Sequence, residues 1–192
     1  LERALGSIPQ DPPAEILVVD TGSTDRTMQV LKHWPQKINV LHSETCTPGA
    51  ARNLGIQQAK GDFIAFLDSD DEWLDNKLDL QLEAFFKDPG IGLVATWADH
   101  VGADGRLVKC YKPHPGDRLL PGLLYENYLP TSSVLVRRSL LIELDLFFRE
   151  DLLLAEDWEL WIRLASRCRC AILNKTLVRY HLSEDSLERN FS

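Results

Sequence analysis

The stretch GDFIAFLDSDDEW, residues 61–73, decides the fold expected of this chain. Its apolar run at residues 63–67 is short, partly aromatic and preceded by a glycine, so it predicts a buried β-strand. Three carboxylates, Asp68, Asp70 and Asp71, follow this strand directly. Carboxylates this close repel one another, and each is costly to bury without a cation, so ordinary core packing does not explain the cluster.

The position of the cluster points to a metal site. In open α/β sheets, ligands bind just beyond the carboxyl ends of the strands. Hard oxygen ligands suit Mg²⁺ or Mn²⁺, which commonly bridge to substrate phosphates. The pattern therefore predicts a divalent-metal site that includes Asp70. The alternative is a helix cap, because Asp71 and Asp75 precede a leucine-rich segment at residues 74–86.

Outward from this stretch, the first 90 residues alternate between strand and helix patterns. Strands are expected at residues 15–20, 38–42 and 63–67, and helices at residues 26–34, 48–60 and 75–87. This alternation is typical of a parallel sheet with helices on its faces. The predicted fold class is therefore α/β, with a mostly parallel nucleotide-binding sheet covered by helices on both faces.

The pattern changes after residue 90. Residues 92–98 and 107–111 flank an Ala-Asp-Gly turn and predict a β-hairpin. Later strands are expected at residues 133–137, 171–173 and 176–180, and helices at residues 119–127, 138–144 and 156–166. We expect one domain over residues 1–192, in which residues 1–90 bind a nucleotide and residues 91–192 form a mixed, acceptor-side half.

Composition limits the partners and the location. The chain has 21 Lys and Arg against 29 Asp and Glu, a net charge of −8, which argues against a nucleic-acid polymer as partner. Its four cysteines form no C-x-x-C pair, so reduced thiols in a cytoplasmic protein are expected rather than a zinc site. No run approaches the ~18 apolar residues of a membrane span, and peripheral contact with the inner face of a membrane stays open.

Two residues upstream of the acidic cluster are candidates for nucleotide binding. Asp20 ends the first predicted strand at a Gly-Ser-Thr-Asp turn, where it can accept a hydrogen bond from a base or a ribose. Its alternative role is to cap that turn, which is common. Arg52 lies in a helix that opens with small residues and offers a forked cation to phosphate or base. The alternative for Arg52 is a surface ion pair.

Downstream, Glu156 and Asp157 open a tryptophan-rich helix. Acidic residues there favour the helix dipole, but they are also candidates for a general base beside an aromatic wall of Trp158 or Trp161. A tryptophan at such a position more often anchors a core. His181 follows a late strand and is a candidate third metal ligand, although a lone histidine is more often structural.

Three motifs, in this order and spacing, resemble glycosyltransferase family 2. They are VVDTGSTDRT at residues 18–27, GAARNLGIQQAKGDFIAFLDSDDEW at residues 49–73 and AEDWELWIRLA at residues 155–165. The resemblance implies a GT-A fold and an inverting transferase that uses a nucleotide-diphosphate sugar with Mn²⁺ or Mg²⁺. It also implies transfer to a carbohydrate or lipid-linked acceptor, with nucleotide-sugar binding in the first half of the chain.

The resemblance also implies roles for individual residues. By their places in the motifs, Asp20 would contact the nucleobase, Arg52 would lie near the nucleotide, and Asp68 and Asp70 would serve ribose and metal. Asp157 would be the base that deprotonates the acceptor hydroxyl. Glu156 and Trp158 are assigned to the acceptor side, and His181 stands where the family more often has arginine.

One departure from the family pattern affects the sheet. The chain begins after the V-S-V-I-I-P-T-Y-N strand that usually opens family members, and that strand is normally central. We therefore expect an unpaired edge on the strand at residues 15–20 or 63–67, and poor anchoring of Leu1, Leu5 and Ile8. The alternative function is a truncated, catalytically weak homologue that binds a nucleotide sugar.

Overall fold

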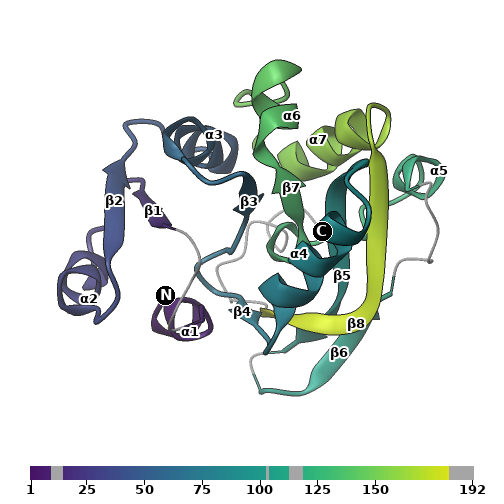
Figure 1. Cartoon of the computed structure of the whole chain (residues 1–192). Helices are drawn as coiled ribbons and strands as arrows, with labels where there is room; N and C mark the ends of the chain where they lie inside the picture. Colours follow the sequence, from purple (N-terminus) through teal and green to yellow (C-terminus); the bar gives the residue numbers. More distant parts are fainter. Residues whose placement is uncertain (10–14, 103, 113–118, 182–192) are drawn as a thin grey trace.

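A computed structural model gives the fold, and the structure describes residues 1–9, 15–102, 104–112 and 119–181. The strands form two sheets (Figure 1). The small sheet pairs β1 (Ile16–Asp20) with β2 (Ile38–His42) in parallel. The large sheet has six strands in the order β3-β7-β5-β8-β4, with β6 paired to β5.

The large sheet contains strands from both halves of the chain. Its strands are β3 (Phe63–Ala65), β4 (Glu72–Trp73), β5 (Ile91–Val101), β6 (Leu107–Tyr111), β7 (Leu135–Arg137) and β8 (Arg169–His181). Only β5 and β8 run parallel in it, and the other pairs are antiparallel. The expected mostly parallel order is therefore wrong, because β7 returns from the second half of the chain to pair with β3. The predicted hairpin of β5 and β6 is confirmed.

Helices lie between the strands along the chain. They are α1 (Glu2–Gly6), α2 (Thr27–His33), α3 (Pro48–Gln58), α4 (Lys77–Lys87), α5 (Leu120–Leu123), the 3-10 helix η1 (Thr131–Ser133), α6 (Arg138–Glu143) and α7 (Glu156–Ala165). The helix expected at residues 119–127 is limited to α5. Within the described ranges, no helix is long and apolar enough to cross a membrane.

Strand β8 also differs from the sequence prediction. Two late strands were expected on either side of Asn174 and Lys175, which are polar and typical of a turn. The structure has one continuous strand in which Leu173 pairs with Thr96 and Thr176 pairs with Trp97. The two residues between them therefore form a bulge on β8, and a bulge of this kind interrupts the sequence pattern without ending the strand.

The main core lies where α7 packs on the large sheet. On α7, Leu160, Trp161 and Leu164 are fully buried, because they share one face of an amphipathic helix. They contact Leu93 of β5 and Val136 of β7 in the same apolar cluster. This packing places the first turn of α7 beside the loop that follows β3.

A cavity of about 730 Å³ separates the two sheets. It is lined by residues of β1, β3, α1 and α3. Within the described chain, β1 pairs with β2 alone and β3 with β7 alone, which confirms the expected unpaired edges. The poor anchoring expected of α1 is wrong, because Leu5 is buried in a small core with Ile16 and Leu31. Leu1 and Ile8 pack against that core.

Candidate active site

The acidic loop, residues 68–71, is closed by its own backbone and by Ser132. The Asp71 N–H donates to the Asp68 carbonyl oxygen at 3.1 Å, which makes the loop a tight turn. The Asp68 N–H donates to Ser132 Oγ at 3.0 Å, and Ser132 Oγ donates to Asp71 Oδ2 at 2.5 Å. The His181 N–H donates to Asp71 Oδ1 at 3.1 Å, so the end of β8 also holds the loop.

These contacts settle the role of Asp71 within the loop. The helix-cap alternative is wrong, because α4 begins after Asn76 and no side chain caps it. Asp71 is instead fully buried, and burial raises its pKa to about 8. Asp71 is therefore a structural residue of the loop, which leaves Asp68 and Asp70 as its partly exposed carboxylates.

Asp70 is the other partly exposed carboxylate of the loop, and its backbone carbonyl accepts a hydrogen bond from the Arg3 side chain. Burial raises its pKa above the ordinary value, and a cation beside it would oppose that rise. Among the described residues, no three acidic, histidine or cysteine side chains are grouped closely enough to hold a metal. One or two carboxylates completed by substrate phosphates are a donor set that Mg²⁺ or Mn²⁺ can use, and the metal role of Asp70 stays a prediction.

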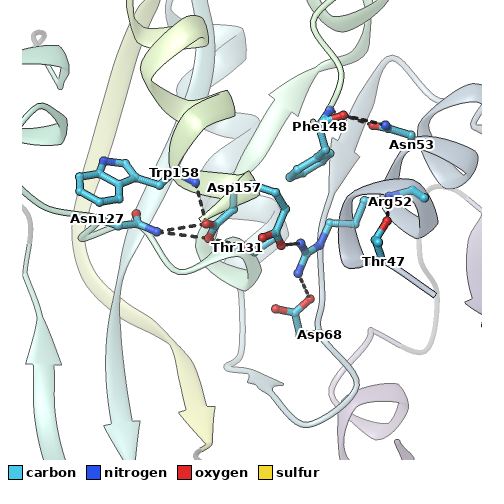
Figure 2. Close-up of polar contacts among 11 residues, drawn as sticks. Thr47, Arg52, Asn53, Asp68, Asn127, Thr131, Phe148, Asp157 and Trp158 are labelled. Carbon is cyan, nitrogen blue, oxygen red and sulfur yellow. Dashed lines mark hydrogen bonds and ion pairs between the residues drawn. The ribbon is translucent and has the colours of Figure 1, made fainter. Parts of the chain in front are cut away.

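Arg52 of α3 joins the acidic loop to α7. Thr47 caps α3 by accepting a hydrogen bond from the Ala50 N–H at 3.3 Å. Arg52 Nη2 donates to Asp68 Oδ1 at 2.8 Å (Figure 2). Arg52 Nη1 donates to Glu156 Oε1 at 2.5 Å. Burial lowers the pKa of Arg52, but its two carboxylate partners outweigh burial and raise it. The arginine side chain is 17% exposed, so these are not the surface pairs of the alternative interpretation.

Asp157 is the second residue of α7, and three neighbours orient its carboxylate (Figure 2). Thr131 Oγ1 donates to Oδ2 at 2.9 Å, the Trp158 N–H donates to Oδ1 at 2.6 Å, and Asn127 Nδ2 lies 3.3 Å from both oxygens. Burial raises the pKa of Asp157, and the charge of Arg52 opposes the rise. A buried carboxylate with a raised pKa is suited to accept a proton.

The structure brings together four of the residues predicted from sequence. Asp68, Arg52 and Glu156 are joined by ion pairs, and the charge of Arg52 also acts on Asp157. They come from the loop after β3, from α3 and from the first turn of α7. Asp70 lies two residues from Asp68 on the same loop.

Asp20 is placed apart from this group, at the end of β1. It accepts hydrogen bonds from the Gly22 and Ser23 N–H groups at 3.4 and 3.1 Å, and it lies 3.5 Å from His42 Nδ1. Hydrogen bonding to Ser23 lowers the pKa of Asp20. Among the described residues, no hydrogen bond or ion pair joins Asp20 to Arg52 or to the acidic loop, and its role as a nucleobase ligand stays a prediction.

His181 and Trp158 have surroundings of their own. His181 Nε2 lies 3.7 Å from Glu72 Oε2, and burial lowers the pKa of the imidazole. Trp158 Nε1 donates to the Leu123 carbonyl oxygen at 2.6 Å, and the ring packs against the main core. The core-anchoring interpretation of Trp158 is therefore confirmed, whereas its contact with an acceptor and the metal role of His181 stay predictions.

Sequence reasoning missed Thr131, Ser132 and Asn127, which contact the candidate site through side-chain oxygen and nitrogen atoms. A signal was present, because residues 130–133 read Pro-Thr-Ser-Ser directly before an apolar strand. Consecutive hydroxyl side chains at a strand end commonly bind neighbouring backbone groups, so the stretch resembled an ordinary turn.

Comparison with known proteins identifies relatives. The sequence profile of glycosyl transferase family 2 matches residues 1–144. A Rickettsia conorii protein named as an uncharacterised glycosyltransferase is 30% identical over 174 residues, which are 88% of this chain and 28% of that protein. The Escherichia coli UDP-Glc:alpha-D-GlcNAc-diphosphoundecaprenol beta-1,3-glucosyltransferase WfgD is 29% identical over 181 residues, which are 92% of this chain and 68% of WfgD.

A solved structure shares the fold. The crystal structure of Staphylococcus aureus TarS 1–349 in complex with UDP-GlcNAc has a TM-score of 0.76 and 26% identity, and the match covers 97% of this chain and 55% of that one. This likeness confirms the predicted α/β fold of the GT-A type. The chain thus spans 28% of the Rickettsia relative and 55% of the TarS fragment. Because the family profile matches residues 1–144 of 192, the chain belongs to glycosyl transferase family 2.

Proposed function

We propose that this chain transfers a sugar from a nucleotide-diphosphate sugar to an acceptor hydroxyl, with inversion of the anomeric carbon and dependence on Mn²⁺ or Mg²⁺. The observation that carries the proposal is the pair of hydrogen bonds by which Arg52 joins Asp68 of the acidic loop to Glu156 of α7. Donor, acceptor and base must surround one reacting carbon, and this link holds the corresponding side chains together. Family membership supports a transferase.

Asp157 is the base in this proposal. Its carboxylate takes the proton of the acceptor hydroxyl while that oxygen attacks the anomeric carbon from the face opposite the diphosphate. A single displacement of this kind inverts the carbon. Thr131 and Asn127 fix the orientation of the carboxylate, and the charge of Arg52 favours the ionised form that can accept a proton. Glu156 and Trp158 are assigned to the acceptor side.

The donor side is assigned to the acidic loop and to the end of β1. Asp20 would bind the nucleobase and Asp68 the ribose, while Asp70 would hold the metal with His181 as a further ligand. A bound divalent ion supplies neutralisation of the charge that develops on the leaving diphosphate. Since both terminal nitrogens of Arg52 already bind carboxylates, Arg52 serves the nucleotide by holding Asp68 in place.

The relatives support the choice of substrates. The TarS structure contains UDP-GlcNAc, which supports a nucleotide sugar as donor. The name of WfgD includes a diphosphoundecaprenol-linked acceptor, which supports a lipid-linked or carbohydrate acceptor. Work on such an acceptor would place the protein in the cytoplasm at the inner face of a membrane. The division into a donor half at residues 1–90 and an acceptor half at residues 91–192 belongs to the same proposal.

A second candidate function is nucleotide-sugar binding without turnover. It is favoured by one observation, that Asp20 stands on a two-stranded sheet separated from β3 by a cavity. A chain of this kind would bind UDP-GlcNAc but release no UDP from it with any acceptor. Measurement of binding and of release on the same sample separates the two functions.

Replacing Asp157 with Asn tests the proposed base. Release of nucleoside diphosphate from UDP-GlcNAc, UDP-glucose and GDP-mannose, with Mn²⁺ and mixed sugar acceptors, should fall by about 10²–10⁴-fold. Donor affinity should change little, because a base acts in the transition state and barely contacts the bound nucleotide. Glu159→Gln, on the same helix, is the matched control and should keep the wild-type rate. An Asp157→Asn variant with most of its turnover would leave that residue only a helix-dipole role.

Replacing Asp70 with Asn tests the metal site. Titration calorimetry should show weaker binding of UDP in the presence of Mn²⁺, because one metal-binding charge is lost. The metal-free variant should unfold at the same temperature as wild type or higher, since fewer clustered charges repel. Asp75→Asn changes an exposed carboxylate five residues later and is the control. Equal Mn²⁺-dependent affinity in wild type and Asp70→Asn would remove the metal role.

A further inference from the structure

The 3-10 helix η1 contacts both parts of the candidate site at once. Thr131 and Ser132 are consecutive residues that are only 4% and 0% exposed. Thr131 donates its hydroxyl hydrogen to Asp157, the proposed base, at 2.9 Å. Ser132 accepts from the Asp68 N–H at 3.0 Å and donates to Asp71 at 2.5 Å. Two neighbouring hydroxyls therefore connect the base to the loop proposed to hold the metal.

Side chains of β4 and α4 hold the backbone of the helix η1 by hydrogen bonds. Trp73 Nε1 of β4 donates to the Ser132 carbonyl oxygen at 2.9 Å, and Gln81 Nε2 of α4 donates to the Ser133 carbonyl oxygen at 2.9 Å. The chain then enters β7, in the interior of the large sheet. Groups held by η1 are therefore held on a rigid part of the fold, as precise catalytic geometry requires.

We propose that Thr131 and Ser132 are positioning residues that fix the Asp157 carboxylate and the acidic loop relative to each other. The inference rests on the proposed function, because it treats Asp157 as the base and the loop as the metal site. Neither residue touches the reacting atoms. Each acts through the group to which its hydroxyl is bonded.

The two hydroxyls have separate effects because each carries a single hydrogen. The Thr131 hydroxyl donates its hydrogen bond to Asp157, so it fixes the orientation of the carboxylate and stabilises the ionised form. The Ser132 hydroxyl donates its hydrogen bond to Asp71, and Ser132 Oγ can therefore accept a hydrogen bond from the Asp68 N–H. Loss of the first hydroxyl should therefore affect proton transfer, and loss of the second should affect donor and metal binding.

The Thr131→Val variant tests the first effect, with Thr131→Ser as the matched control. Valine keeps the shape of threonine without its hydroxyl, whereas serine keeps the hydroxyl. The pKa of Asp157, followed by carbon-13 NMR of its carboxyl group, should rise in the valine variant and stay at the wild-type value in the serine variant. Arg52 and Glu156, the charged groups that act on Asp157 in the described structure, are the same in both variants.

Turnover gives a second measurement for Thr131. Release of UDP from UDP-GlcNAc should slow about 10–100-fold in the valine variant, as is typical when a group that orients a catalytic residue is lost. The affinity for UDP with Mn²⁺ should not change. A purely structural role would lower the melting temperature in both variants and leave the pKa of Asp157 unaltered, and that result would overturn the proposal for Thr131.

The Ser132→Ala variant tests the second effect, with Ser133→Ala as the control. Ser133 is equally buried, and its hydroxyl donates to the Pro130 carbonyl oxygen at 2.7 Å instead of to the acidic loop. Affinity for UDP in the presence of Mn²⁺ should fall about 10–100-fold in Ser132→Ala and should hold in Ser133→Ala. Equal affinities in the two variants would overturn the proposal for Ser132.

The outcomes separate this inference from the proposed function. If Asp157→Asn abolishes turnover while Thr131→Val leaves both turnover and the pKa of Asp157 unchanged, the function stands and the positioning role falls. If Asp157→Asn keeps full turnover, the proposed base falls, and the positioning role of Thr131 falls with it, because that role acts through the base. If wild type binds no UDP with Mn²⁺, the metal-site proposal and the Ser132 inference fall together.

Discussion

Lys77 places an ionisable amine inside the protein, at 2% exposure. Its Nζ donates to Gln81 Oε1 at 2.8 Å and lies 4.5 Å from the centre of the Trp73 ring. Burial lowers the pKa of Lys77 from 10.5 to about 7. Between these two values the unfolded chain binds a proton that the folded chain does not. The contribution of Lys77 to the free energy of unfolding therefore rises with pH across this window and is constant below about pH 7.

This residue gives a prediction about pH. The difference in unfolding free energy between wild type and Lys77→Met should change in favour of wild type from pH 7 to pH 10, by at most ~1.4 kcal/mol per pH unit. Urea unfolding at four pH values measures it. Lys87→Met, at an exposed position of the same helix, should run parallel to wild type. Parallel curves for Lys77→Met as well would show that the buried amine keeps its ordinary pKa.

At the residue scale, the sequence identified the charged residues but not their supports. Asp68 and Asp70 were found because clustered carboxylates at a strand end need an explanation, whereas Asp157 lies at a helix start, where acidic residues are ordinary, and was singled out by its place in the family motif. Arg52 was also found as a candidate, but its ion pair with Glu156 could not be predicted, because the two residues are 104 positions apart along the chain. Thr131 was missed because a hydroxyl before a strand has many ordinary local roles.

Gly92 shows how tightly neighbouring elements meet. A Cβ at this position of β5 would lie 2.6 Å from Cys168 Sγ and 2.7 Å from Cys168 Cβ, and would also overlap Leu140 of α6. Gly92→Ala should therefore lower the free energy of unfolding by about 1–3 kcal/mol, the usual cost of overpacking. Gly6→Ala, at a position in α1 with open space, should be neutral or slightly stabilising. Thermal unfolding compares them, and equal melting temperatures would contradict the crowding at Gly92.

Elements with a strong period were predicted well, and elements whose partners are distant were not. The positions of α4, α7 and the β5–β6 hairpin followed from local apolar spacing, which reports the face that each element buries. The bulge in β8 and the antiparallel pairing of β3 with β7 depend on strands that come from other parts of the chain. No local pattern encodes such a partner, and the alternation of strands and helices therefore predicted parallel neighbours.

At the scale of the whole molecule, the cavity between β1 and β3 offers two unpaired strand edges. Extending the chain upstream by about ten residues, the length of a strand and a turn, is expected to raise the melting temperature. Affinity for UDP should improve together with it, because Asp20 would then be fixed relative to the acidic loop. A Gly-Ser extension of equal length is the control, since it cannot fill an apolar space. If the strand-forming extension changes neither the melting temperature nor the affinity for UDP, the two sheets are stable without a strand between them.

The small core of Leu5, Ile16 and Leu31 is separate from the main core beneath α7. A unit with few buried apolar groups can open without disrupting the rest, so β1 and β2 are expected to exchange amide hydrogens by a sub-global route of lower free energy. A nucleotide bound both by Asp20 of the small sheet and by the acidic loop that follows β3 would suppress that route. Part of the free energy of nucleotide binding would then be used to suppress the local opening of β1 and β2. Nucleotide binding should therefore carry a large negative heat-capacity change.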